Sequence, residues 1–79
     1  MKANKDQIEI RIIKVSELLK KYRKDAGYSS YEQFAIDNDL DRKQYWRAEN
    51  GANLTLKSLF SILDKHNISA KEFFNNLSD

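Results

Sequence analysis

Residues 41–51, with the sequence DRKQYWRAENG, form the stretch that decides the fold. Asp41 is a favourable N-cap, because its carboxylate can accept hydrogen bonds from the free N–H groups of a first helical turn. Gly51 stands where a left-handed residue commonly ends a helix. The pattern therefore predicts a short helix over about residues 42–50.

Helical spacing divides this stretch into two faces. Tyr45 and Ala48 fall on one face, with Leu40 just before the cap. The other face carries cations and an aromatic ring, with a glutamine beside them: Arg42, Lys43, Arg47, Trp46 and Gln44. Arg and Lys can donate to guanine in the major groove of double-stranded DNA, and Gln can pair with adenine. On this face alone, a base-reading surface and a solvated basic helix both remain open.

The rest of the composition favours one small helical domain. The chain has 79 residues, no cysteine, no proline and two glycines, so it offers neither disulfides nor thiolate metal sites. The net charge of +2 is low for a dedicated nucleic-acid binder, and the distribution of charge matters more than its sum. No apolar run approaches a membrane span and no signal-peptide core follows the start, which predicts a soluble, cytoplasmic protein.

The first long helix is expected over about 7–25. Its apolar residues recur at helical spacing and are widened by Ile13 and Leu18: Ile8, Ile12, Val15, Leu19 and Tyr22. Asp6 is the expected N-cap, residues 1–5 are an expected flexible tail, and Gly27 ends the helix.

The remaining helices follow from caps and short stripes. A second helix is expected over about 31–38, capped by Ser29 or Ser30, with Phe34 and Ala35 facing inward. Asn38 and Asp39 then form a tight turn. A fourth helix begins after Thr55 and a short fifth one after Ser69, with these apolar residues: Leu56, Leu59, Phe60, Leu63, Phe73, Phe74 and Leu77. Residues 6–79 thus form one all-α domain of five helices.

From about Val15 to Leu77 the chain resembles the Cro and C1 phage-repressor type of helix-turn-helix, the XRE family. The resemblance is carried by Tyr22-Arg23 before Gly27, Phe34-Ala35, the inward Tyr45 and Ala48, Glu49-Asn50-Gly51, and the stripe from Leu56 to Leu63. It implies a five-helix lambda-repressor-like domain, in which the second helix crosses the DNA backbone and the third enters the major groove. The family usually acts as a homodimer.

The resemblance also implies roles for individual residues. Arg42, Lys43 and Arg47 match base-contacting positions, and Gln44 and Trp46 lie beside them. The expected phosphate contacts come from the second helix and from the end of the third: Ser30, Tyr31, Asn50 and Asn53. Arg23 and Glu49 match an ion pair that ties the first helix to the third.

Several positions depart from the family pattern. Asp39 stands where a glycine is usual between the second and third helices, and Leu54 replaces a proline near the fourth. Trp46 replaces a small polar residue; it can contact a thymine methyl group or pack as core. Tyr31 can bind a phosphate or cover the edge of the core.

The sequence shows no enzyme signature. Its carboxylates form no pair with a nucleophile or base, it has no glycine-rich phosphate loop, and His66 has no grouped partners for a metal, so no cofactor and no metal are expected. Two functions remain: a DNA-binding regulator, most simply a repressor, and a protein-interaction or antitoxin-type module. A toxin or a sensor protein is therefore a candidate partner besides DNA.

Overall fold

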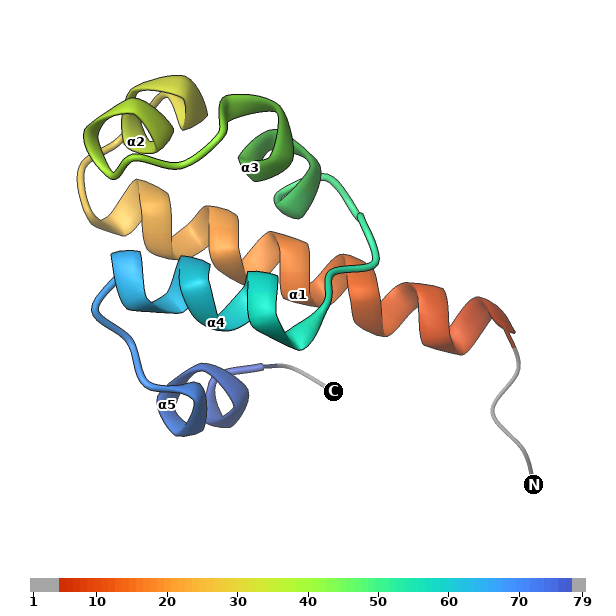
Figure 1. Cartoon of the computed structure of the whole chain (residues 1–79). Helices are drawn as coiled ribbons and strands as arrows, with labels where there is room; N and C mark the ends of the chain where they lie inside the picture. The colour runs from red at the N-terminus through yellow and green to blue at the C-terminus, as the bar shows by residue number, and fades with distance from the viewer. Residues whose placement is uncertain (1–4, 78–79) are drawn as a thin grey trace.

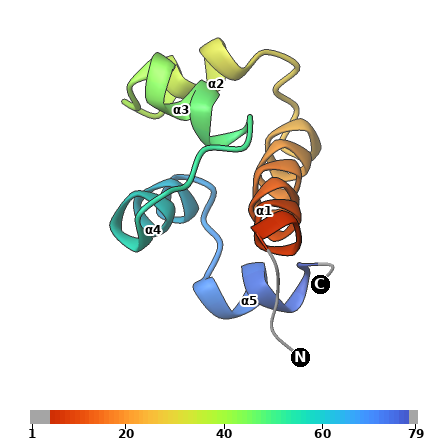
Figure 2. The same ribbon diagram turned by 90° about the vertical axis from the view of Figure 1, so that its right-hand side faces the viewer.

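The computed structural model describes residues 5–77, and over this range the chain is all-helical, as predicted (Figure 1). Five helices follow one another, with no strand among the described residues: α1 (Lys5–Asp25), α2 (Tyr31–Asp37), α3 (Arg42–Ala48), α4 (Leu56–Lys65) and α5 (Ala70–Asn75). α2 and α3 lie together along one side of α1, whereas α4 and α5 lie along another (Figures 1 and 2). None of the helices in residues 5–77 combines the length and the apolar character that a membrane crossing requires.

The helix boundaries differ slightly from the predicted ones. α1 already includes Lys5, so Asp6 lies inside the helix and does not cap it. The rest of the expected tail, residues 1–4, lies outside the described range. α3 ends at Ala48 rather than at Asn50, because the chain turns at Glu49 and Asn50. In this turn the Asn50 N–H donates to the carbonyl of Arg47, three residues earlier.

Side-chain caps begin the four later helices. The carboxylate of Asp41 accepts from the Gln44 N–H at 2.9 Å, as predicted from the sequence. Ser30, rather than Ser29, caps α2. The hydroxyls of Thr55 and Ser69 cap α4 and α5. Each cap satisfies one of the free N–H groups of a first turn, which contributes about 1 kcal/mol per helix.

Four helices end at a left-handed residue. Gly27 and Gly51 have φ of +93° and +87°, and Asp39 and Asn67 have φ of +56° and +58°. After each of them, the next N–H donates back to a carbonyl in the last helical turn. The Ala52 N–H, for example, donates to the Arg47 carbonyl at 3.1 Å. This pairing satisfies a carbonyl that the helix leaves free. Asp39 thus takes a left-handed backbone conformation that glycine adopts most readily, and Asp tolerates it better than most other residues.

The core lies between the helices and contains the predicted inward residues. Every helix contributes buried apolar residues, and Ile68 comes from the connection between α4 and α5. The full set is Leu19, Phe34, Ala35, Tyr45, Ala48, Leu59, Ile62, Leu63, Ile68 and Phe73. Part of the predicted apolar stripes is nevertheless exposed, namely Ile8, Ile13, Leu56, Phe60 and Phe74. The first turns of α1 extend beyond the ends of the other four helices (Figure 1).

Candidate nucleic-acid interface

The helix α3 is held by its inner side and exposed on its outer side. Tyr45 and Ala48 are buried in the core, and the Asp41 cap fixes the first turn. The five candidate base-contacting side chains are all exposed: Arg42, Lys43, Gln44, Trp46 and Arg47. The structure thus brings these residues together on one short, well-supported helix.

The exposed side chains of α3 form two rows, as helical spacing requires. Lys43 and Arg47 are four residues apart and lie opposite Tyr45, so they form the outermost row. Arg42 and Trp46 form a second row on one flank. The Arg42 guanidinium is 4.0 Å from the Glu32 carboxylate of α2, and both side chains are mostly exposed, so this ion pair contributes little stability.

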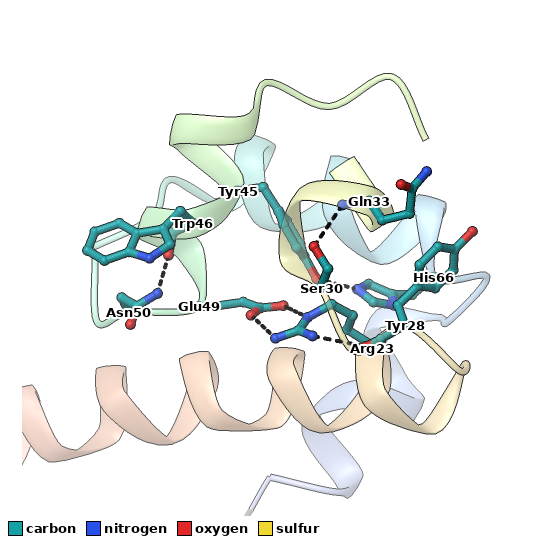
Figure 3. A network of polar contacts seen from close by, with 9 residues as sticks. All are labelled: Arg23, Tyr28, Ser30, Gln33, Tyr45, Trp46, Glu49, Asn50 and His66. Atoms are coloured by element: carbon teal, nitrogen blue, oxygen red, sulfur yellow. Dashed lines mark hydrogen bonds and ion pairs between the residues drawn. The ribbon is translucent and has the colours of Figure 1, made fainter. Parts of the chain in front are cut away.

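Trp46 lies outside the core. Its exposed fraction is 46%, and Figure 3 shows the indole pointing away from the ion pair beneath α3. It lines an open hollow between the first turns of α2 and α3, together with Tyr31 and Lys43. Tyr31 is half-buried: it packs against the core and also faces this hollow. The interpretation of Trp46 as a core residue is therefore wrong, whereas both interpretations of Tyr31 fit its position.

The other candidate phosphate ligands lie around α3 with some of their polar groups engaged. The Ser30 hydroxyl accepts from the Gln33 N–H at 3.3 Å and can still donate its own hydrogen (Figure 3). The Asn50 amide donates to the Trp46 carbonyl at 2.7 Å and has a second N–H. Asn53 is exposed in the loop between α3 and α4.

A buried ion pair connects α1 to the end of α3 (Figure 3). Arg23 Nε and Nη2 donate to the two carboxylate oxygens of Glu49, each at 2.8 Å, and Nη1 donates to the Tyr28 carbonyl at 2.9 Å. Arg23 and Glu49 are only 5% and 4% exposed. The hydrogen bond to Glu49 raises the pKa of Arg23 further, so the guanidinium stays charged. Two parallel bonds to one carboxylate fix the direction in which α3 leaves α1.

A second tie between these helices was not foreseen. The Ser16 hydroxyl, buried on α1, accepts from the Gly51 N–H at 2.8 Å. Ser16 lies between the apolar positions of α1, and periodicity alone treats such a serine as solvent-facing. The indication available in the sequence is that Ser16 and Arg23 are seven residues apart, which places both on one side of a helix.

An aromatic layer supports α2 and α3 from beneath. The His66 ring at the end of α4 stacks on Phe34 of α2, with 4.4 Å between ring centroids, and its Nε2 lies 3.4 Å from the Tyr45 hydroxyl. Burial lowers the pKa of His66; Glu49 opposes this shift and Arg23 adds to it. Burial likewise raises the pKa of Tyr45, and its bond to Glu49 adds to that shift. Both rings are therefore neutral at pH 7 and pack as apolar groups.

A cavity of about 370 Å³ opens between α3 and α4. Gln44, Arg47 and Asn53 line its α3 side, and Lys57 with the hydroxyls of the first turns of α4 lines the other. This contribution of α4 was not predicted, because no motif in the sequence marks Lys57. Its position in the first turn after the loop was the only indication available.

Within residues 5–77, no group of three or more His, Cys, Asp or Glu side chains is placed to hold a metal ion. Comparisons of the chain with protein-family models, with curated proteins and with solved structures found no match.

Proposed function

We propose that the protein is a sequence-specific DNA-binding regulator of the Cro and C1 helix-turn-helix type, acting as a repressor. In this proposal α2 crosses the DNA backbone and α3 enters the major groove. Lys43 and Arg47 contact base edges, with Arg42, Gln44 and Trp46 beside them. A homodimer presents two α3 helices to two half-sites about one DNA turn apart.

One observation carries this proposal: α3 is fixed on its inner side at three places and is cationic on its outer side. Tyr45 is buried in the core, Glu49 is bonded to Arg23, and Gly51 is bonded to Ser16. Positioning of this kind favours recognition, because a contact pays little entropy when its scaffold is already ordered. Each good bidentate contact to a base would add about 1–3 kcal/mol of discrimination.

The test is selection of bound fragments from sheared genomic DNA at two salt concentrations. The wild-type chain is compared with the triple variant Arg42→Ala, Lys43→Ala, Arg47→Ala. The matched control removes three exposed cations elsewhere, with Lys21→Ala, Lys24→Ala and Lys71→Ala. We expect a shared, partly palindromic site that the control retains and the α3 variant loses. Its affinity should fall steeply with salt, because each neutralised phosphate releases counterions.

Equal losses in the two triple variants would indicate unspecific attraction by charge and would contradict the proposal. Far-UV circular dichroism of both variants checks that the fold is retained. A second candidate function, binding of a partner protein such as a toxin or a sensor, is favoured by the exposure of Trp46 and Phe60. It predicts no enriched DNA site at either salt concentration.

A further inference from the structure

The cavity between α3 and α4 has apolar walls. Its volume of about 370 Å³ lies within the range of pockets that bind small molecules, which begins at about 300 Å³. Four apolar side chains line it, two of them buried and two half-buried: Tyr45, Ile62, Leu40 and Leu54. An apolar group placed against these walls would remove their surface from water, which is favourable.

Two cations line the same cavity. Arg47 and Lys57 form no ion pair with any other residue that the structure describes. Arg47 lies in the last turn of α3 and Lys57 in the first turn of α4. Residues 49–55 connect these two helix ends directly, so both cations lie at the same end of the cavity (Figure 1).

A hydrogen-bond donor lies beside the two cations. The Ser58 hydroxyl lines the cavity and accepts from the Thr55 hydroxyl at 3.0 Å. Because a serine hydroxyl can both accept and donate, that of Ser58 still has its own hydrogen to donate to a ligand.

The carboxylate that lines the cavity lies away from the cations. Asp41 precedes Arg47 by six residues, which is about 9 Å along a helix axis. This carboxylate is also engaged as the cap of α3, where it accepts from the Gln44 N–H at 2.9 Å. The end of the cavity next to the connection is therefore positively charged and suits an anionic group.

We propose that this cavity binds a small molecule with an apolar body and one anionic head group, such as an aromatic carboxylate or sulfonate. The body lies against the apolar walls. The head group lies between Arg47 and Lys57 and accepts from the Ser58 hydroxyl. A phosphate of the DNA backbone matches this cavity less well, because it has the charge but no apolar part to cover the walls.

Such a ligand would be an effector that releases DNA. This role rests on the proposed function, whereas binding of the ligand does not. Arg47 and Gln44 line the cavity and are also candidate base contacts of α3. A head group paired with Arg47 would hold its guanidinium away from a base edge, so ligand and DNA would compete.

Isothermal titration calorimetry of the full chain without DNA tests the binding with three probes. Naphthalene-2-sulfonate has both an apolar body and a charge, naphthalene-2-sulfonamide has the body without the charge, and inorganic sulfate has the charge without the body. We expect the sulfonate to bind and the other two to bind at least tenfold more weakly. No binding of the sulfonate at millimolar concentration, or equal binding of the sulfonamide, would overturn the proposal. Sulfate bound as tightly as the sulfonate would indicate a site for simple anions and would also contradict it.

A matched pair of lysine variants locates the site. Lys57→Gln and Lys43→Gln each remove one exposed cation, but only Lys57 lines the cavity. Lys57→Gln should weaken binding of the sulfonate about threefold, the effect of one exposed ion pair, and Lys43→Gln should leave it unchanged. Ser61→Leu places a larger side chain in the cavity and should weaken binding at least tenfold. Equal effects of the two lysine variants would place the probe elsewhere and contradict the proposal.

The effector role is measured with a DNA site selected as described above. Naphthalene-2-sulfonate should raise the dissociation constant of the wild-type chain for that site, and it should have much less effect on Ser61→Leu. An unchanged dissociation constant would contradict the effector role. The absence of any selected site would contradict the proposed function and leave the calorimetric result standing, so the two failures can be told apart.

Discussion

Removal of Arg23 should destabilise the domain far more than removal of the cation next to it. In Arg23→Met the Glu49 carboxylate remains 4% exposed but loses both hydrogen bonds of 2.8 Å. The Tyr28 carbonyl loses its donor as well. Breaking a buried pair by removal of one partner costs about 3–5 kcal/mol, because the remaining charge is buried without a partner. That loss is comparable to the whole stability of a domain of this size, about 4–12 kcal/mol.

The control is Lys24→Met, which makes the same kind of change at an exposed position one residue further on. Its effect should stay within about 0.5 kcal/mol. Urea denaturation followed by circular dichroism measures both, and a loss of 3 kcal/mol in a domain of this size lowers Tm by about 12–24 °C. Equal urea midpoints for the two variants would refute the reasoning.

A double variant separates the two contributions of the pair. In Arg23→Met with Glu49→Met no buried charge is left, so most of the lost stability should return. The two parallel hydrogen bonds that fix the direction of α3 would still be absent. We therefore expect this variant to fold but to bind DNA more weakly than the wild type. A double variant no more stable than Arg23→Met would show that packing of the guanidinium, rather than charge burial, dominates.

Three further predictions concern single residues. Burial lowers the pKa of His66 below its usual 6.5, so the unfolded chain binds a proton at a higher pH than the folded chain does. The free energy of unfolding should therefore fall as the pH decreases below about 6.5. In His66→Phe this part of the pH profile of stability should be flatter. At φ +56°, Asp39→Val should cost about 1–2 kcal/mol in urea denaturation, whereas Asp39→Gly should be neutral or stabilising. Asp41→Ala removes the α3 cap and should lower stability by about 1 kcal/mol, with little loss when Asn replaces Asp41.

Local signals in the sequence predicted most of the helices and their inward residues. Caps such as Asp41 and Thr55 and stops such as Gly51 act within one helical turn, so their effect can be read from neighbouring residues. The exposure of Ile8 and Phe60 could not be predicted in this way. Periodicity shows which side of a helix is apolar, but burial depends on whether another helix reaches that side.

In the candidate site, too, some features could be predicted from the sequence and others could not. The exposure of Lys43 and Arg47 follows from their spacing relative to Tyr45, which the sequence states directly. The tie between Ser16 and Gly51 joins residues far apart in the chain, and neither residue type indicates the other. The stacking of His66 on Phe34 likewise depends on where the end of α4 lies relative to α2. Such contacts require the tertiary arrangement.

In α3 the residues that hold the helix in place differ from the residues proposed to contact DNA, so the two sets can be substituted with different effects. Tyr45, Glu49 and Gly51 hold the helix from inside, while Lys43 and Arg47 take no part in the core. Substitutions in the outer row should therefore alter what is bound with almost no effect on stability, since exposed positions rarely change it by more than about 0.5 kcal/mol. Substitutions in the inner row should abolish binding through the fold. A regulator built in this way can acquire new operator sequences without new stabilising contacts.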